Sequence, residues 1–135
     1  MKLDQELKSW KPIKGLKGLY KINNIKFINK TMSIELSSQI DKNSKIVVLF
    51  DGPVESYKYK EKKHSKIWEQ SIKKDLSLVS LDWSFFKVTN SNYLKWLSEK
   101  SCGVSNIYDF IHFVIVDTDK IIEVIYLCDP EVCFL

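Results

Sequence analysis

Few side chains in this sequence have catalytic chemistry, and the most prominent is a histidine inside an apolar segment. His112 stands in the middle of residues 110–114, where a histidine facing a cleft could act as a general base. The alternative is a core histidine with one hydrogen-bonded ring nitrogen, which the apolar neighbours favour. No serine or aspartate stands at a spacing that predicts a triad with it. His64, at the start of a lysine-rich segment, is expected to be exposed.

Three cysteines are a second possible source of chemistry. Cys102, Cys128 and Cys133 are an odd number, which argues against a disulfide framework and predicts free, buried thiols. Cys128 could pair with His112 as nucleophile and base, but a thiol in an apolar hairpin is usually inert. The spacing is not that of a zinc site, and four glycines cannot build a phosphate loop. We therefore expect that the protein binds no metal or cofactor and is not an enzyme.

Acidic residues concentrate near the end of the chain. Paired carboxylates can perform acid–base chemistry or hold Mg²⁺, and the alternatives are solvated surface charge or a docking patch for a basic partner. As candidate residues of such a docking patch we select Asp109, Asp117, Asp119, Glu123, Asp129 and Glu131.

A lysine cluster lies upstream, beside Tyr57, Tyr59 and Trp68. Its members are Lys58, Lys60, Lys62, Lys63 and Lys66. Lysines interleaved with aromatic rings can bind single-stranded nucleic acid by charge and stacking. All 21 basic residues are lysine, however, and dedicated nucleic-acid readers use arginine for bidentate contacts. A nucleic-acid-binding module that uses the segment 61–76 is therefore the second hypothesis.

The net charge of +4 is unevenly distributed along the chain. Residues 1–75 hold 17 Lys against 9 acidic residues, whereas residues 76–135 hold 4 Lys against 8. The two parts thus carry +8 and −4, which indicates either ordinary solvated surface or two faces for different partners. The N-terminus lacks the apolar stretch of a signal peptide, and no apolar run could span a bilayer, so we expect a cytoplasmic protein.

β-Branched residues dominate the apolar set, which predicts a strand-rich core. The chain has 15 Ile and 10 Val and no alanine. Alternation and apolar runs predict strands at 19–28, 31–38, 45–50, 54–59, 83–88, 109–117 and 121–127, and a final short strand or tail at 132–135. Helical spacing predicts helices at 61–76 and 92–101 and a short helix or turn at 3–10. The helix at 92–101 is expected to bury Tyr93, Leu94, Trp96 and Leu97.

Most neighbouring strands are separated by short turn signals, which indicates hairpins and an antiparallel sheet. Residues 45–50 and 54–59, for example, flank a turn at Asp51-Gly52-Pro53. We therefore predict a single α+β domain over residues 1–135. Its fold would be a curved, mainly antiparallel sheet of about six to seven strands with two helices packed on one face.

Several segments together resemble small bacterial proteins that accompany polymorphic toxins. They are Phe50-Asp51-Gly52-Pro53, Trp83 to Val88, Asn90-Ser91, Tyr93 to Glu99, Ile111-His112-Phe113 and Asp129 to Val132. These stretches are similar to immunity proteins, the class that includes those of contact-dependent growth inhibition.

The resemblance covers roughly residues 45–135 and implies a small single-domain inhibitor that caps a cognate toxin domain in the cytoplasm. The sequence does not fix the oligomeric state, and we favour a monomer. It transfers no binding residues, because immunity interfaces differ between lineages. Inhibitors of basic nuclease toxins tend to be acidic, whereas this chain is net basic. Either the acidic C-terminal part docks, or the toxin is not basic.

Overall fold

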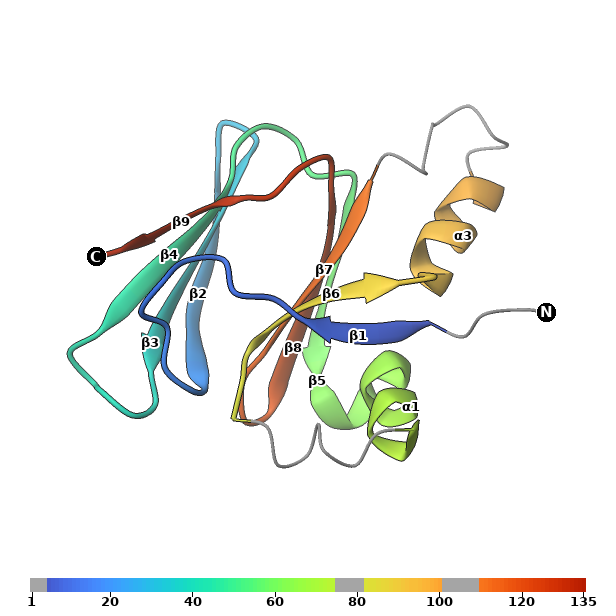
Figure 1. Cartoon of the computed structure of the whole chain (residues 1–135). Coiled ribbons are helices and arrows are strands. Elements are labelled where there is room, and N and C mark those ends of the chain that lie inside the picture. Colours follow the sequence, from blue (N-terminus) through green and yellow to red (C-terminus); the bar gives the residue numbers. More distant parts are fainter. Residues whose placement is uncertain (1–4, 75–81, 101–109) are drawn as a thin grey trace.

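In the residues that it describes, the computed structural model shown in Figure 1 contains two antiparallel sheets and two α-helices. The structure describes residues 5–74, 82–100 and 110–135. Within these residues it contains nine strands. The α+β class is therefore confirmed, whereas the single sheet of six to seven strands is wrong.

The larger sheet has five strands in the order β1-β6-β7-β8-β5. These are β1 (Glu6–Ser9), β5 (Ser56–Glu61), β6 (Phe85–Thr89), β7 (Ile111–Val116) and β8 (Lys120–Tyr126). Nearly every residue of β7 and β8 is buried, whichever face of the sheet it points to. Burial on both faces explains why these two strands are almost entirely apolar, with His112 and Glu123 as the polar residues inside them, and do not alternate with polar residues.

The smaller sheet has four strands in the order β2-β3-β4-β9. These are β2 (Tyr20–Ile28), β3 (Thr31–Ser38), β4 (Lys45–Phe50) and β9 (Glu131–Phe134). Asn29 and Lys30 join β2 to β3 with φ angles of 49° and 67°. Positive φ at both central residues is the signature of the type I′ turn, so the predicted tight hairpin is confirmed.

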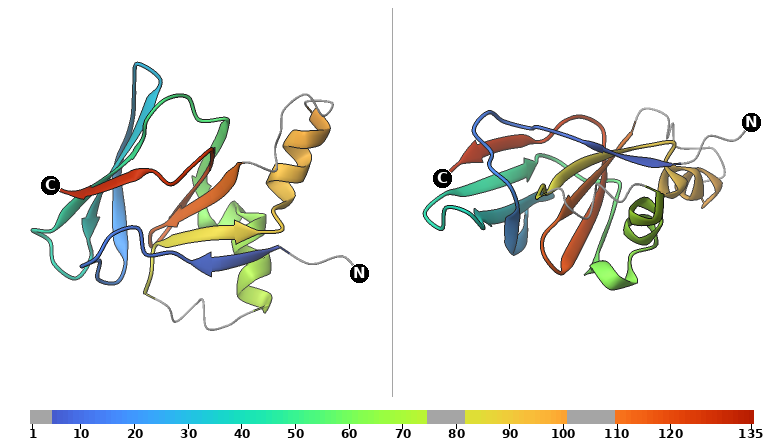
Figure 2. Two further views of the ribbon diagram at one scale, coloured as in Figure 1. Left: turned by 45° about the horizontal axis from the view of Figure 1, so that its top comes forward. Right: turned by 60° about the horizontal axis from the view of Figure 1, so that its bottom comes forward.

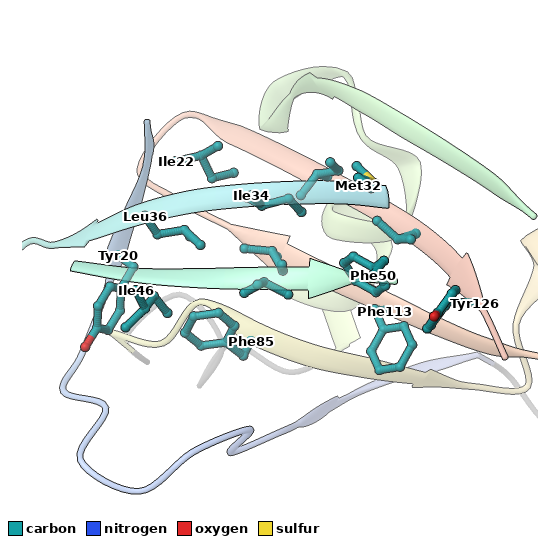
Figure 3. Close-up of a cluster of buried hydrophobic side chains, with 14 residues drawn as sticks. Tyr20, Ile22, Met32, Ile34, Leu36, Ile46, Phe50, Phe85, Phe113 and Tyr126 are labelled. Carbon is teal, nitrogen blue, oxygen red and sulfur yellow. The ribbon is translucent and has the colours of Figure 1, made fainter. Parts of the chain in front are cut away.

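The main core lies between the two sheets (Figure 3). Phe113 of β7 is fully buried, with its ring centroid 5.6 Å from that of Phe50 and 5.1 Å from that of Trp10. Tyr126 packs its ring edge-on against Phe50 at 5.2 Å. The aliphatic side chains of β3 and β4 complete this layer. Alternate residues of β3 point inward, as its sequence predicts.

The helices cover the other face of the larger sheet (Figure 2). They are α1 (Lys66–Lys74), preceded by the 3₁₀ turn η1 (Lys62–His64), and α3 (Asn92–Lys100). Ile67 of α1 packs in a second cluster with Phe86 and Val114 of the sheet. Tyr93 of α3 is buried, with its ring 5.4 Å from that of His112. The larger sheet is thus the middle layer of three.

Two further local predictions are wrong because tertiary pairing decides them. Residues 6–9 form β1, which pairs with β6, although the spacing of Leu3, Leu7 and Trp10 suggested a helix. Residues 56–61 form β5, which pairs with β8 and not with β4. A four-residue segment carries little intrinsic preference, so the hydrogen-bonding edge of β6 determines its conformation. Residues 75–76 and 101 of the predicted helices lie outside the described residues.

Ser84 connects the two sheets, and replacing it tests how firmly they are joined. Its buried hydroxyl accepts the Tyr20 N–H at 2.8 Å and lies 3.3 Å from the Tyr20 carbonyl oxygen. Ser84→Ala would leave that N–H without its partner, so we expect a loss of about 1–3 kcal/mol in the free energy of unfolding. Urea denaturation measures this loss. Ser37→Ala, which removes an exposed hydroxyl, is the matched control and should change the stability by less than about 0.5 kcal/mol.

Candidate functional site

A groove of about 420 Å³ runs between α1 and α3 over the helix-covered face of the larger sheet. We call it the basic groove. It is lined by Gln5, Lys58, Lys60, His64, Lys66, Ile67, Gln70, Asn92, Tyr93, Trp96, His112 and Glu123. Among these described residues, three lysines and two histidines accompany one carboxylate. The groove therefore favours an anionic ligand.

A buried hydrogen-bond chain lies at the floor of the groove. Nδ1 of His112 is 2.6 Å from Oγ of Ser91, and Nε2 is 2.8 Å from Oε1 of Glu123. The exposed fractions of the three residues are 5% for Ser91, 1% for His112 and 4% for Glu123. The prediction of a core histidine is confirmed, but both ring nitrogens are bonded, and sequence spacing did not reveal the serine or the glutamate.

The same order of groups, serine to histidine to carboxylate, occurs in hydrolytic triads, but here the Ser91 hydroxyl also caps a helix. Its Oγ also accepts the Leu94 N–H at 3.1 Å and so forms the N-cap of α3. Ser91 is buried and is not a lining residue of the groove. The chain therefore ties the first turn of α3 to β7 and β8, and this places Tyr93 and Trp96 over β5.

The lysine at the centre of the groove is held against aromatic rings. The Lys58 ammonium lies 4.0 Å from the ring centroid of Tyr93 and 6.0 Å from that of Trp96. The Tyr93 hydroxyl hydrogen-bonds the Ser56 hydroxyl, and burial raises the Tyr93 pKa. Trp96 was expected to be buried, but 49% of its surface is exposed. This lysine–aromatic cluster presents both charge and a stacking surface to a ligand.

The predicted basic cluster is only partly assembled in one place. Lys58, Lys60 and Lys66 line the groove. Lys62 instead lies 4.7 Å from the ring of Trp68, and burial lowers its pKa against the opposing influence of nearby aspartates. Lys63 is 3.2 Å from the Glu61 carboxylate, whose pKa it lowers. His64 is exposed, as predicted.

The acidic residues predicted as a docking patch are not brought together. Asp117 is buried on the side of the smaller sheet, where its carboxylate accepts the N–H groups of Ile22, Asp119 and Lys120. Glu123 is buried on the opposite face, beneath the helices, as part of the His112 chain. Both side chains are almost inaccessible to solvent, so neither can form part of an exposed acidic surface.

The remaining acidic candidates lie at separate places. Asp119 is exposed in the turn between β7 and β8. Asp129 is beyond the other end of β8, with its carboxylate 2.8 Å from the Lys87 ammonium. Glu131 is exposed on β9 of the smaller sheet. Asp109 lies outside the described residues. No continuous acidic patch therefore forms among the candidates that the structure describes.

Cys128 and Cys133 are free, as predicted, but both are exposed, so the expectation of buried thiols is wrong for them. Cys128 follows the end of β8, and Cys133 belongs to the short edge strand β9. Cys102 lies outside the described residues. In the described ranges, no three potential metal ligands gather, and no helix is long and apolar enough to cross a membrane.

The chain matches no family model, no curated protein and no solved structure.

Proposed function

We propose that this protein is an immunity-type inhibitor that binds a cognate toxin domain in the cytoplasm, with the basic groove as its docking surface. The observation that supports the proposal is the convergence of Lys58, Lys60 and Lys66 with two aromatic rings between α1 and α3. Exposed aromatic side chains such as Trp96 are enriched at protein interfaces, and the lysines around it would attract a partner of complementary charge.

The distribution of charge indicates which kind of toxin surface would fit. The acidic side chains of the C-terminal part are buried, paired or scattered, whereas the lysines of the groove converge. Complementary potentials favour association, so the partner would present carboxylates to the groove. Of the two alternatives left by the net charge of the chain, this distribution favours a toxin that is not basic at its interface.

The proposal assigns the protein no catalytic step of its own. Ser91 caps α3, and Glu123 holds His112 inside the fold. Gln5, Gln70 and Asn92 line the groove as amides, which can hydrogen-bond a partner but are poor nucleophiles and bases. Binding, and not bond-making, is therefore the function that this arrangement supports best.

Salt dependence tests the proposal on the natural pair. We expect the purified chain to bind the toxin domain encoded beside it with 1:1 stoichiometry and to abolish its toxicity on co-expression. Because the groove lysines would meet carboxylates at the edge of solvent, Kd should rise about tenfold between about 50 and 300 mM salt. Isothermal titration calorimetry at the two salt concentrations measures this. A Kd that does not change with salt, or toxicity that persists, contradicts the proposal.

A nucleic-acid-binding module is the second candidate, because the same lysines and the exposed Trp96 could hold a phosphate backbone and stack a base. The absence of arginine argues against it. Mobility-shift assays with single-stranded DNA and RNA separate the two functions, since an immunity protein gives no shift at about physiological salt and a nucleic-acid binder does.

A further inference from the structure

We propose that β5 receives an extended segment of the partner as an added strand, with acidic side chains of that segment pointing into the basic groove. The inference deepens the proposed function and rests on it. Its starting point is that β5 is an edge strand, paired with β8 on one side only. An exposed edge of this kind is a template for strand addition.

The hydrogen-bonding register shows which backbone groups of β5 are available. The Lys62 N–H donates to the Asp119 carbonyl at 2.9 Å. In an antiparallel pair the residues that bond the neighbour alternate, so Lys58 and Lys60 also bond β8. The backbone groups of Tyr57 and Tyr59 consequently face away from the sheet. Within the described part of the chain, no residue bonds them.

The other edge strands are less suited to this role. β1 and β9 have four residues each, and a register shift between Ile22 and Asn24 interrupts the edge of β2. Bulges protect a sheet edge from added strands. β5 has six residues in uninterrupted register. It therefore offers the most regular free edge among the described strands.

The two faces of β5 specify the chemistry of the added strand. Lys58 and Lys60 pair with Glu123 and Ile121 and so point to the helix side, into the groove. Tyr57 and Tyr59 point to the other side and expose 47% and 45% of their surfaces. A partner strand would place every second side chain beside the lysines and the others beside the tyrosines. The fitting segment alternates acidic and apolar residues.

Charge also decides between a partner and a second copy of this chain. If two β5 strands paired, the lysines of one would stand beside those of the other on the same face, and like charges across a strand pair are destabilising. Lysines on an edge strand commonly prevent self-association in this way. An acidic strand meets no such repulsion, which is why we assign the edge to the partner.

Backbone substitution tests the assignment. Tyr59→Pro removes an N–H that faces away from β8, a position where an edge strand tolerates proline. Tyr59→Val is the matched control, because it removes the same side chain and retains the N–H. We expect Tyr59→Pro to weaken binding of the toxin domain about tenfold more than Tyr59→Val does. Equal affinities of the two variants would overturn the inference.

Hydrogen exchange gives a test on the unmodified chain that does not depend on whether the proline variant folds. The amides of Tyr57 and Tyr59 should exchange quickly in the free protein and become protected in the complex. The amides of Lys58 and Lys60, already bonded to β8, should be protected in both states. Toxin binding without new protection at Tyr57 and Tyr59 would overturn strand addition and leave the proposed function intact.

A peptide probe tests strand addition at β5 separately from the immunity function. A hexapeptide of alternating Glu and Val should bind with a Kd at least about tenfold lower than that of the block sequence Glu-Glu-Glu-Val-Val-Val. The NMR signals of β5, followed during titration with each peptide, give the two Kd values. That result without any binding of the toxin domain would support the edge assignment and refute the immunity function. Equal binding of the two peptides would refute the alternating-strand requirement.

Discussion

Replacing His112 with leucine is expected to lower the free energy of unfolding by about 3–5 kcal/mol. The variant would leave the Glu123 carboxylate and the Ser91 hydroxyl without their bonds to the ring nitrogens. Both groups are almost inaccessible to water, so solvent cannot replace the lost partner at low cost. Urea denaturation followed by circular dichroism measures the loss as a lower midpoint with an unchanged slope.

A double variant distinguishes the cost of unpaired polar groups from the cost of a changed shape. His112→Leu combined with Glu123→Leu removes the buried pair and leaves the Ser91 hydroxyl, which still accepts the Leu94 N–H. The double variant should therefore recover most of the stability lost by His112→Leu. His64→Leu is the control for losing a histidine at an exposed site and should cost less than about 0.5 kcal/mol. If His112→Leu were as stable as His64→Leu, the hydrogen-bond chain would not support α3.

Reversing the charge of two groove lysines is expected to weaken binding of the toxin domain by about 100-fold or more. Lys58→Glu with Lys60→Glu replaces two attractions with two repulsions at a surface that excludes part of the water. Lys42→Glu with Lys45→Glu changes the net charge equally, but at exposed positions on the β3–β4 turn and the start of β4. This control should weaken binding by less than about threefold. Equal losses would indicate long-range steering in place of docking in the groove.

Short-range patterns in the sequence predicted individual elements well. The hairpin of β2 and β3 follows from the strand patterns predicted at 19–28 and 31–38, and the helix over 92–100 follows from the helical spacing of its apolar residues. The arrangement of sheets could not be predicted in the same way. The pattern of residues 56–61 does not distinguish pairing with β4 from pairing with β8, because no residue of β5 is buried and both partners are apolar.

The candidate site was hidden for a related reason. Ser91, His112 and Glu123 are separated by 21 and 11 residues, and only the pairing of β6, β7 and β8 brings them together. One signal was available. If residues 111–116 and 120–126 form a hairpin, His112 and Glu123 occupy diagonal positions on the same face of the sheet. Two polar side chains placed in this way inside two apolar strands indicate a buried contact between them. The described acidic candidates do not share a surface, because residues close in sequence lie on different faces and strands or are buried.

The location of the interface is the central claim, and the tryptophan indole signals of the protein test it most directly. Trp96 is exposed in the groove, whereas the indole N–H of Trp83 donates to the Trp10 carbonyl at 3.0 Å, away from it. On titration with the unlabelled toxin domain, proton–nitrogen NMR spectra should show the Trp96 indole signal shifting and the Trp83 signal unchanged. A saturable complex in which the Trp96 signal stays in place would contradict docking in the basic groove.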